Sequence, residues 1–374
     1  MMTMWKVDWS TRRVRSWCVG GASALLLTLL TATEVQAQDF SYTNTNGTIT
    51  ITGYSGPGGV VAIPSTIIGL PVTSLGDAVF AGSTAVASVT IPDSVTNIGQ
   101  STFGSCAVLT NVSIGNGVRS IGYGAFSSCQ GLTHITIPNS VTDLKDGMYT
   151  IGGVGVFYRC SNLTSVSLGN GLTNIGDSAF WFCTGLTNIT IPGNVLRVGA
   201  HAFESCSRLA SITMSNGVRS LDSDSFGNCP SLTNVTIVSS VTNIGGYAFA
   251  GSSLSNVFFA GNAPSGYIGA EANAVTVYYL PGTTGWGPTF DGHPTVLWNP
   301  QAQTSDASFG VRQGRFGFNI RGTADIPLVV EASTDVLAQS WVPLQNCTLT
   351  NGLIYFSDPQ WTNFPRRFYR IRSP

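Results

Sequence analysis

The sequence predicts an α/β solenoid, made mostly of short parallel β-strands with one helical turn per 23-residue repeat, followed by a small all-β module. Three observations support this prediction. Cysteines recur every 23 residues, apart from one gap of 31, at Cys106, Cys129, Cys160, Cys183, Cys206 and Cys229. Phenylalanines keep the same step three residues earlier, in about eight units from Phe80 to Phe249. A period of this size is typical of stacked arrays, and a different pattern of alternating strands begins after residue 300.

The apolar positions within one unit indicate which parts of each coil face inward. Residues 109–114 follow the pattern L-x-x-V-x-I, in which Val112 and Ile114 alternate with polar neighbours, as a half-buried strand requires. A glycine or proline ends this strand, and apolar residues three apart then predict a second short extended piece. Residues 125–129 are expected to form one tight helical turn, with the phenylalanine and cysteine on one face. Because no unit can bury its apolar face alone, neighbouring units must stack.

The periodic and aperiodic stretches divide the chain into six segments. We predict a signal peptide at 1–37, an N-terminal cap at 38–60, repeats at 61–252, a C-terminal cap at 253–299, a linker at 300–308 and a β-rich module at 309–374. Where the cysteine spacing grows from 23 to 31, the repeats contain an eight-residue insertion within residues 145–155.

The first 37 residues have the composition of an export signal. Arg12, Arg13 and Arg15 precede an apolar stretch at 19–30, and small residues lead to an expected cut after Ala37. This stretch is too short to span a membrane, and no later segment is long enough. We therefore expect an exported protein, extracellular or at the cell surface, with no transmembrane segment in the mature chain. The arginine doublet leaves the export route open.

Charge and motif content argue against several function classes. Charged residues make up 9% of the chain and its net charge is −1, whereas nucleic-acid binding needs clustered Lys and Arg, so no nucleic acid partner is expected. A 23-residue spacing places equivalent side chains in line, so no Ser-His-Asp or Cys-His set can be assembled. No paired carboxylates or phosphate-binding glycine loop stand out. The sequence thus predicts a protein that is not an enzyme and holds no cofactor.

The cysteine column allows three interpretations. Buried free thiols can act as small apolar residues, and Ser83 and Ser252 occupy the column at its two ends, which favours a structural thiol ladder. Disulfides between adjacent coils are permitted in an exported protein, although the side chains would run parallel. A metal site is the least favoured, because close C-x-x-C pairs are absent. Cys347 stands alone outside the array.

Two blocks carry a resemblance to a known family. "LTHITIPNSVTDL" and "IGDSAFWFCTGLTNITIP" resemble the BspA-type leucine-rich repeat family of bacterial surface and secreted proteins, over roughly residues 60–260. The resemblance implies a leucine-rich-repeat solenoid that binds or adheres at a cell surface, often to protein partners. It does not identify the partner.

The exposed strand positions form two polar columns, one including His134 and the other Thr136, without the Trp, Tyr and Arg anchors of tight interfaces. We therefore place candidate binding residues where the period is broken, because insertions in repeat proteins often form the binding face. These residues are Lys145, Asp146, Met148 and Tyr149 in the insertion, and Arg366, Arg370 and Arg372 in the last strand. The arginines could meet an anionic cell-envelope polymer or simply form a solvated edge. The predicted function is a secreted or surface-associated scaffold for protein binding or adhesion, with a protein, envelope or glycan partner. The alternative is a passive structural or surface-layer component with no ligand.

Overall fold

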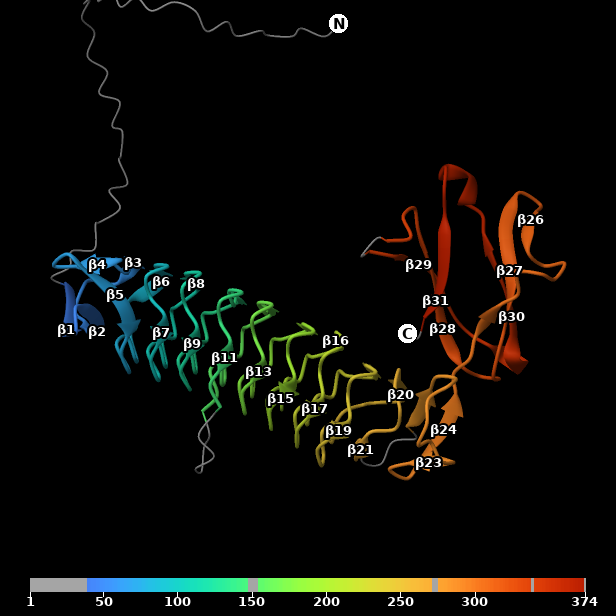
Figure 1. Cartoon of the computed structure of the whole chain (residues 1–374), viewed down its shortest axis with the longest axis horizontal. Helices are drawn as coiled ribbons and strands as arrows, with labels where there is room; N and C mark the ends of the chain where they lie inside the picture. Colours follow the sequence, from blue (N-terminus) through green and yellow to red (C-terminus); the bar gives the residue numbers. More distant parts are fainter. Residues whose placement is uncertain (1–38, 147–153, 271–274, 338–339, 373–374) are drawn as a thin grey trace, which may run out of the picture. The chain divides into compact units, whose positions relative to one another are not determined.

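The protein is a stack of coils followed by a sandwich-like module. The computed structural model describes residues 39–146, 154–270, 275–337 and 340–372, which lie within one compact unit, Val35–Pro374. Figure 1 shows successive coils lying one after another from β1 to β21, and each repeat places one strand on each of two faces. The predicted solenoid of mostly parallel strands is confirmed.

One face of the solenoid is a single 12-stranded sheet. After the antiparallel pair β1–β2, each strand pairs in parallel with the strand one coil further on, so that Ile98, for example, lies opposite Ile121. In spatial order the strands are β1 (Phe40–Thr45), β2 (Thr48–Tyr54), β5 (Leu70–Leu75), β7 (Asn97–Ile98), β9 (Ser120–Ile121), β11 (Asp143–Leu144), β13 (Asn174–Ile175), β15 (Arg197–Val198), β17 (Ser220–Leu221), β19 (Asn243–Ile244) and β21 (Ser265–Gly266), with β4 (Thr66–Ile67) paired to β5.

The other face consists of longer strands in four shorter sheets. These are β3 (Gly59–Ala62), β6 (Val86–Ile91) and β8 (Asn111–Ile114); β10 (His134–Thr136) and β12 (Ser165–Ser167); β14 (Asn188–Ile191) and β16 (Ser211–Met214); and β18 (Asn234–Ile237), β20 (Asn256–Phe259), β22 (Thr276–Tyr279) and β24 (His293–Leu297) with antiparallel β23 (Thr289–Phe290). Buried and exposed residues alternate along β8 and β14, as the sequence predicts for half-buried strands.

The core of the solenoid is organised as ladders of identical side chains. The phenylalanines from Phe80 to Phe249 stack face to face, with ring centroids 4.9–5.5 Å apart and ring planes within 9° of parallel. From Phe103 to Phe249 all seven rings are fully buried. The stack continues across the insertion, where Phe126 and Phe157 lie 5.3 Å apart. Each ring from Phe103 to Phe226 therefore contacts the equivalent ring of both neighbouring coils.

The cysteines form a second ladder beside the rings. All six ladder cysteines are free and buried, and each thiol donates a hydrogen bond to the carbonyl of the ladder phenylalanine one coil earlier, at 3.0–3.3 Å. Ser252 keeps the column at its far end by bonding its hydroxyl to the Phe249 carbonyl. The structural thiol ladder is thus confirmed, and Cys347 is also a free thiol.

The predicted helical turn in each repeat is wrong. Within the coils described between residues 59 and 270 the chain forms turns and no helical segment. Alternate N–H groups donate to different partners: those of Phe126 and Ser128 bond to Val156 and Tyr158 of the next coil, whereas those between bond three residues back. A helix needs every N–H for local bonds, and Gly124 and Ser128 have positive φ values of 63° and 57° that break it.

The repeats therefore turn through left-handed backbone two residues before and two residues after the ladder phenylalanine, except that the repeat of Phe157 does so only at the second position. The first position is occupied by Ala78, Ser101, Gly124, Ser178, His201, Asp224 and Tyr247, and the second by Gly82, Ser105, Ser128, Arg159, Phe182, Ser205, Asn228 and Gly251. Small residues dominate both positions, because a Cβ atom is strained in this conformation. Arg159, Phe182, His201 and Tyr247 are the bulky departures.

The C-terminal module has two sheets that share a core. One contains β25 (Gln301–Ala302), β27 (Arg315–Arg321), β26 (Gly310–Arg312) and β30 (Leu353–Asp358), and the other β29 (Val342–Thr348), β28 (Pro327–Ser333) and β31 (Phe368–Arg372), with short 3₁₀ segments at Thr350–Gly352 and Trp361–Asn363. Phe318 and Ile320 of the first sheet are buried with Leu328 and Val330 of the second. Residues 300–308, expected to be a linker, contribute β25 to the first sheet.

Candidate functional site

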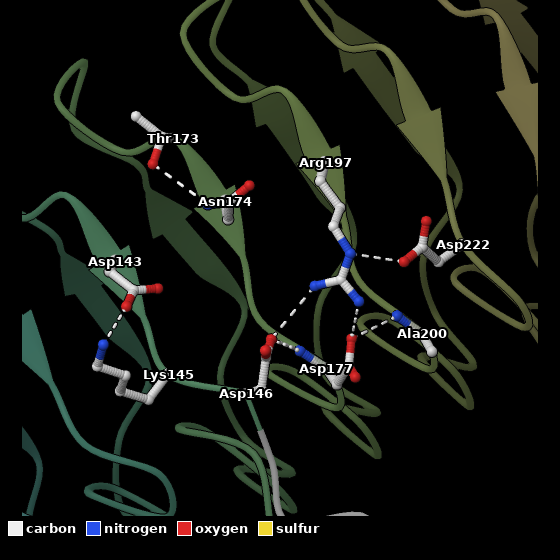
Figure 2. Close-up of polar contacts among 9 residues, drawn as sticks. All are labelled: Asp143, Lys145, Asp146, Thr173, Asn174, Asp177, Arg197, Ala200 and Asp222. Atoms are coloured by element: carbon white, nitrogen blue, oxygen red, sulfur yellow. Dashed lines mark hydrogen bonds and ion pairs between the residues drawn. The ribbon is translucent and has the colours of Figure 1, made fainter.

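The first two predicted binding residues of the insertion are held by their own surroundings. Lys145 forms an ion pair with Asp143 (Figure 2). The Asp146 carboxylate accepts a hydrogen bond of 2.9 Å from the backbone N–H of Asp177 in the next coil. Asp177 does the same for Ala200, so aspartates at this position tie one coil to the next. Met148 and Tyr149 lie outside the described residues.

Arg197, at the start of β15, lies among carboxylates from three other coils (Figure 2). Its Nε atom is 2.6 Å from Asp222 and its Nη2 atom 2.5 Å from Asp177, while Nη1 is 3.3 Å from Asp146. Burial alone would lower the pKa of Arg197, but the hydrogen bonds and charges of Asp222 and Asp177 raise it overall. Because the guanidinium nitrogens are already paired with these carboxylates, we interpret the cluster as a set of ion pairs that holds neighbouring coils together, and we call it the clamp.

Replacing Arg197 with alanine should lower the free energy of unfolding by about 1–2 kcal/mol, because it leaves three neighbouring carboxylates without their cation. Urea unfolding would measure the difference in free energy of unfolding between R197A and the control R119A. The control removes an exposed arginine that lies one residue before the equivalent position in another coil. Raising the salt concentration should narrow the gap by screening the carboxylates. Equal stability of the two variants would show that the clamp contributes nothing.

The arginines of the last strand hold a buried acid. Phe368, Arg370 and Arg372 share the exposed side of β31, whereas Arg366, which was also predicted in the last strand, lies exposed just before it. Arg370 and Arg372 lie 2.7 and 2.6 Å from the carboxylate of Glu331, which is 3% exposed. Arg370 also packs over the Trp341 ring at 4.6 Å. Two of the three predicted arginines thus have a structural partner.

This pairing makes the module sensitive to acid. Burial would raise the pKa of Glu331, but the hydrogen bonds and charges of Arg372 and Arg370 lower it below the ordinary 4.5. A depressed pKa means that the stabilisation is present above pH 4.5 and is lost as the pH falls through the folded-state value. Glu331→Gln should cost about 2–4 kcal/mol at pH 7 and progressively less below pH 4.5. Thermal unfolding of the parent protein and of Glu331→Gln between pH 7 and values below pH 4.5 would test this prediction. A difference in stability that does not change with pH would contradict it.

The exposed strand columns are as polar as expected. His134 and Thr136 of β10 both point to solvent, and Asn111 bonds to Ser88 across neighbouring strands at 3.2 Å. No Phe, Tyr, Trp or Arg occupies these columns along the described strands from β6 to β18. These columns therefore present no anchor residue.

Anchor residues lie instead at the turns on either side of the ladder phenylalanines. We call Tyr158, Arg159, Trp181, Phe182 and His201 the turn-edge cluster. Trp181 packs against Tyr158, Phe182 and His201, with ring centroids 5.3, 5.3 and 5.8 Å away. The Arg159 guanidinium lies 5.1 Å from the Tyr158 ring centroid and 5.6 Å from that of Phe182. Arg159 is exposed, and the other four are half-buried.

Backbone hydrogen bonds between coils align these turns. The N–H of Arg159 donates to the Trp181 carbonyl at 2.9 Å, and the N–H of Phe182 donates to the Glu204 carbonyl at 3.0 Å. In this register, residues that are 23 positions apart in the sequence lie side by side in adjacent coils. The sequence did not predict this cluster, because candidate binding residues were chosen from the strand columns and from breaks in the period. Its signal was present as bulky residues at turn positions where other repeats carry Gly or Ser.

Two acidic residues border the turn-edge cluster. Glu204 lies 2.6 Å from His201 Nδ1 and accepts a 3.3 Å hydrogen bond from Asn228. Burial raises the pKa of the nearby Asp224; the charge of His201 opposes this rise and that of Glu204 adds to it. The surface thus combines rings, an exposed cation and a partly desolvated acidic edge.

Comparison with known families identifies the repeat. The model of a family described as "BspA type Leucine rich repeat region (6 copies)" matches residues 61–151 and 150–265, more than half of the 374-residue chain. The chain belongs to the BspA-type leucine-rich repeat family. The leucine-rich repeat match covers the solenoid, including the coils that carry the turn-edge cluster.

Several solved structures are similar to this leucine-rich repeat chain. A leucine-rich repeat protein of T. pallidum is 29% identical, with 58% of this chain and 88% of that chain covered and a TM-score of 0.43. One from Bacteroides ovatus is 25% identical, with 66% and 71% covered and a TM-score of 0.47. A leucine rich cell surface protein from Faecalibacterium prausnitzii is 25% identical, with 66% and 87% covered and a TM-score of 0.39. A search of curated proteins found no match.

Leucine-rich repeat proteins generally act as non-catalytic scaffolds that bind proteins. In the part of this leucine-rich repeat chain that the structure describes, no group of three or more His, Cys, Asp or Glu is placed to hold a metal ion. Among the same residues, no helix has the length and apolar character needed to cross a membrane.

Proposed function

We propose that the protein is an exported, surface-associated scaffold that binds another protein through its turn-edge cluster, without catalysis. The observation that carries this proposal is the composition of the cluster. Trp, Tyr and Arg dominate the energetics of protein–protein interfaces, and here they gather on one edge, while the exposed strand columns from β6 to β18 have none.

The backbone supports the same conclusion. Phe182 and His201 have φ values of 59° and 57°, and left-handed backbone costs a bulky L-residue roughly 1–2 kcal/mol. Some repeats avoid this cost with a glycine, such as Gly82 or Gly124, and most of the others carry a smaller residue there. Strained residues that a scaffold does not need for folding are good candidates for function.

Export is supported by the composition of residues 1–37, and the expected mature protein begins at Gln38. In addition, we propose that the insertion and Arg366, Arg370 and Arg372 contribute secondary contacts, the arginines toward anionic envelope polymers. All three arginines point to solvent even though two of them also bind Glu331.

The test is to immobilise the purified mature protein and measure binding of individually purified host-surface and matrix proteins. We expect saturable binding of at least one protein, weakened at least tenfold in Phe182→Gly, which places in this turn the residue that other repeats carry as Gly82 and Gly251. Because glycine suits this backbone, the variant should fold normally. Gly replacement of the exposed Ser105, at the same turn position in another coil, is the matched control.

The alternative function is a passive structural or surface-layer component. The bland polar strand face favours it, because self-association needs no aromatic anchors. Ordered self-assembly of the purified protein, together with no saturable binding to any protein tested, would replace the proposed function by this one.

A further inference from the structure

A separate open groove lies near the C-terminal end of the solenoid. It has a volume of about 480 Å³ and is bordered by Gly246, Tyr247, Tyr267, Asp291 and His293. This volume lies within the range of small-molecule sites, roughly 300–1,000 Å³. None of these residues belongs to the turn-edge cluster.

Two tyrosines expose their rings at this groove. Tyr247 and Tyr267 are 58% and 61% exposed, which is unusual for large aromatic side chains. Tyr247 occupies a left-handed turn position, with φ 60°, where other repeats carry Ser101, Gly124 and Ser178. Folding therefore does not require this ring. The two tyrosines do not form a ring–ring contact with each other in the described structure, so they offer two separate flat surfaces.

A tight hairpin supplies the polar side of the groove. Asp291 and Gly292 connect β23 to β24 with φ values of 51° and 79°, as in the two-residue Asp-Gly turns that join antiparallel strands. One oxygen of Asp291, Oδ2, accepts a 2.9 Å hydrogen bond from the backbone N–H of Gly269, which fixes the carboxylate. Its second oxygen, the His293 ring and the hydroxyls of both tyrosines remain as donors and acceptors for a ligand.

We propose that this groove binds a neutral carbohydrate chain. Sugar rings present apolar C–H faces that pack on aromatic rings, and hydroxyls that need both donors and acceptors at the edge. The groove offers both, and its described lining residues include one carboxylate and no Lys or Arg, which disfavours an anionic ligand. Two separated ring surfaces fit an extended oligosaccharide better than a compact quaternary ammonium ion, which needs converging rings.

Gly246 provides a way to block the groove without disturbing the fold. A Cβ atom added there meets no atom within 4 Å, and its backbone φ lies outside the left-handed range. The equivalent position in another repeat holds Gln100. Gly246→Gln should therefore fill the groove with a side chain that the coil geometry accepts.

The experiment is affinity electrophoresis of the full mature protein in native gels that each contain one soluble neutral polysaccharide: a mixed-linkage β-glucan, xyloglucan, galactomannan, α-mannan, dextran or glycogen. We expect at least one to retard the protein, with the apparent affinity reduced at least tenfold in both Tyr247→Gly and Gly246→Gln. Tyr42→Ser, which removes an exposed tyrosine of β1, should behave as the parent protein.

Three results would overturn the proposal: no retardation by any of the polysaccharides, retardation unchanged in both groove variants, or groove-dependent binding of tetramethylammonium alone in equilibrium dialysis. Circular dichroism of each variant establishes whether it is folded. If Tyr247→Gly does not fold, Gly246→Gln alone still tests the proposal. Because Phe182→Gly leaves this groove intact, loss of protein binding and loss of carbohydrate binding are separately measurable.

Discussion

Replacing Phe180 with alanine is expected to lower the free energy of unfolding by about 3–5 kcal/mol. The ring is fully buried and stacks on Phe157 and Phe203, each with centroids 5.1 Å away. Alanine would leave a cavity between two coils that cannot close, because the strands on both sides fix the coil spacing. In a repeat array each unit is stabilised mainly by its two neighbours, so both interfaces weaken at once.

Urea unfolding followed by circular dichroism measures this effect, and it should also reveal a split of one transition into two, as the coils on either side uncouple. Phe182→Gly is the matched control, since it removes the same ring type two residues away from a half-buried, left-handed site. We expect this control to change stability by less than about 1 kcal/mol. A loss of similar size in both variants would refute the idea that the ladder carries the stability.

The six ladder thiols should be essentially unreactive toward aqueous thiol reagents at pH 8 while the protein is folded. Burial raises their pKa values, to about 11 for Cys106 and about 12 for Cys160 and Cys229, so almost no thiolate forms at pH 8. The thiolate is the reactive species, and the buried sulfur atoms are also inaccessible to reagent. Reactivity should stay low until the pH approaches these values or the chain unfolds.

Counting modified thiols with Ellman's reagent, before and after denaturation, tests this expectation. Seven cysteines lie within residues 38–374, the expected mature chain, and only the half-buried Cys347 should react in the native protein. All seven should react in urea without prior reduction. Fewer thiols after unfolding, restored by a reductant, would instead reveal disulfides.

The repeat core could be predicted from the sequence because each of its positions recurs in register. Val112 and Ile114 alternate in one strand, and the same pattern in seven other units leaves one consistent arrangement of buried faces. The local turn conformation could not be predicted in this way. Phe126 and Cys129 share a face in a helical turn and also in the observed turns, so their spacing does not distinguish the two. What decides is the bonding of N–H groups to the next coil, which is not encoded in the spacing within one repeat.

The candidate sites were predicted less well, for a related reason. Lys145 and Asp146 were chosen because they lie where the period is broken. Lys145 pairs with Asp143 of its own coil, whereas the partners of Asp146, Asp177 and Arg197, come close to it only once the coils are stacked. Conversely, the turn-edge cluster and Tyr247 of the groove keep the period and depart from the other repeats only in side-chain size. A comparison of repeats position by position at the left-handed turns would have identified Phe182, His201 and Tyr247.

The insertion between Asp146 and Val154 has a consequence for how such proteins can be engineered and can diversify. Leu144 still pairs with Ile121, and Phe157 still stacks on Phe126 and Phe180 at 5.3 and 5.1 Å, within the spacing found in uninterrupted coils. Extra residues at this seam therefore leave the register of the coils untouched. Every repeat has an equivalent seam, so foreign peptides could be grafted at chosen intervals along the array, each displayed at a known multiple of the strand spacing.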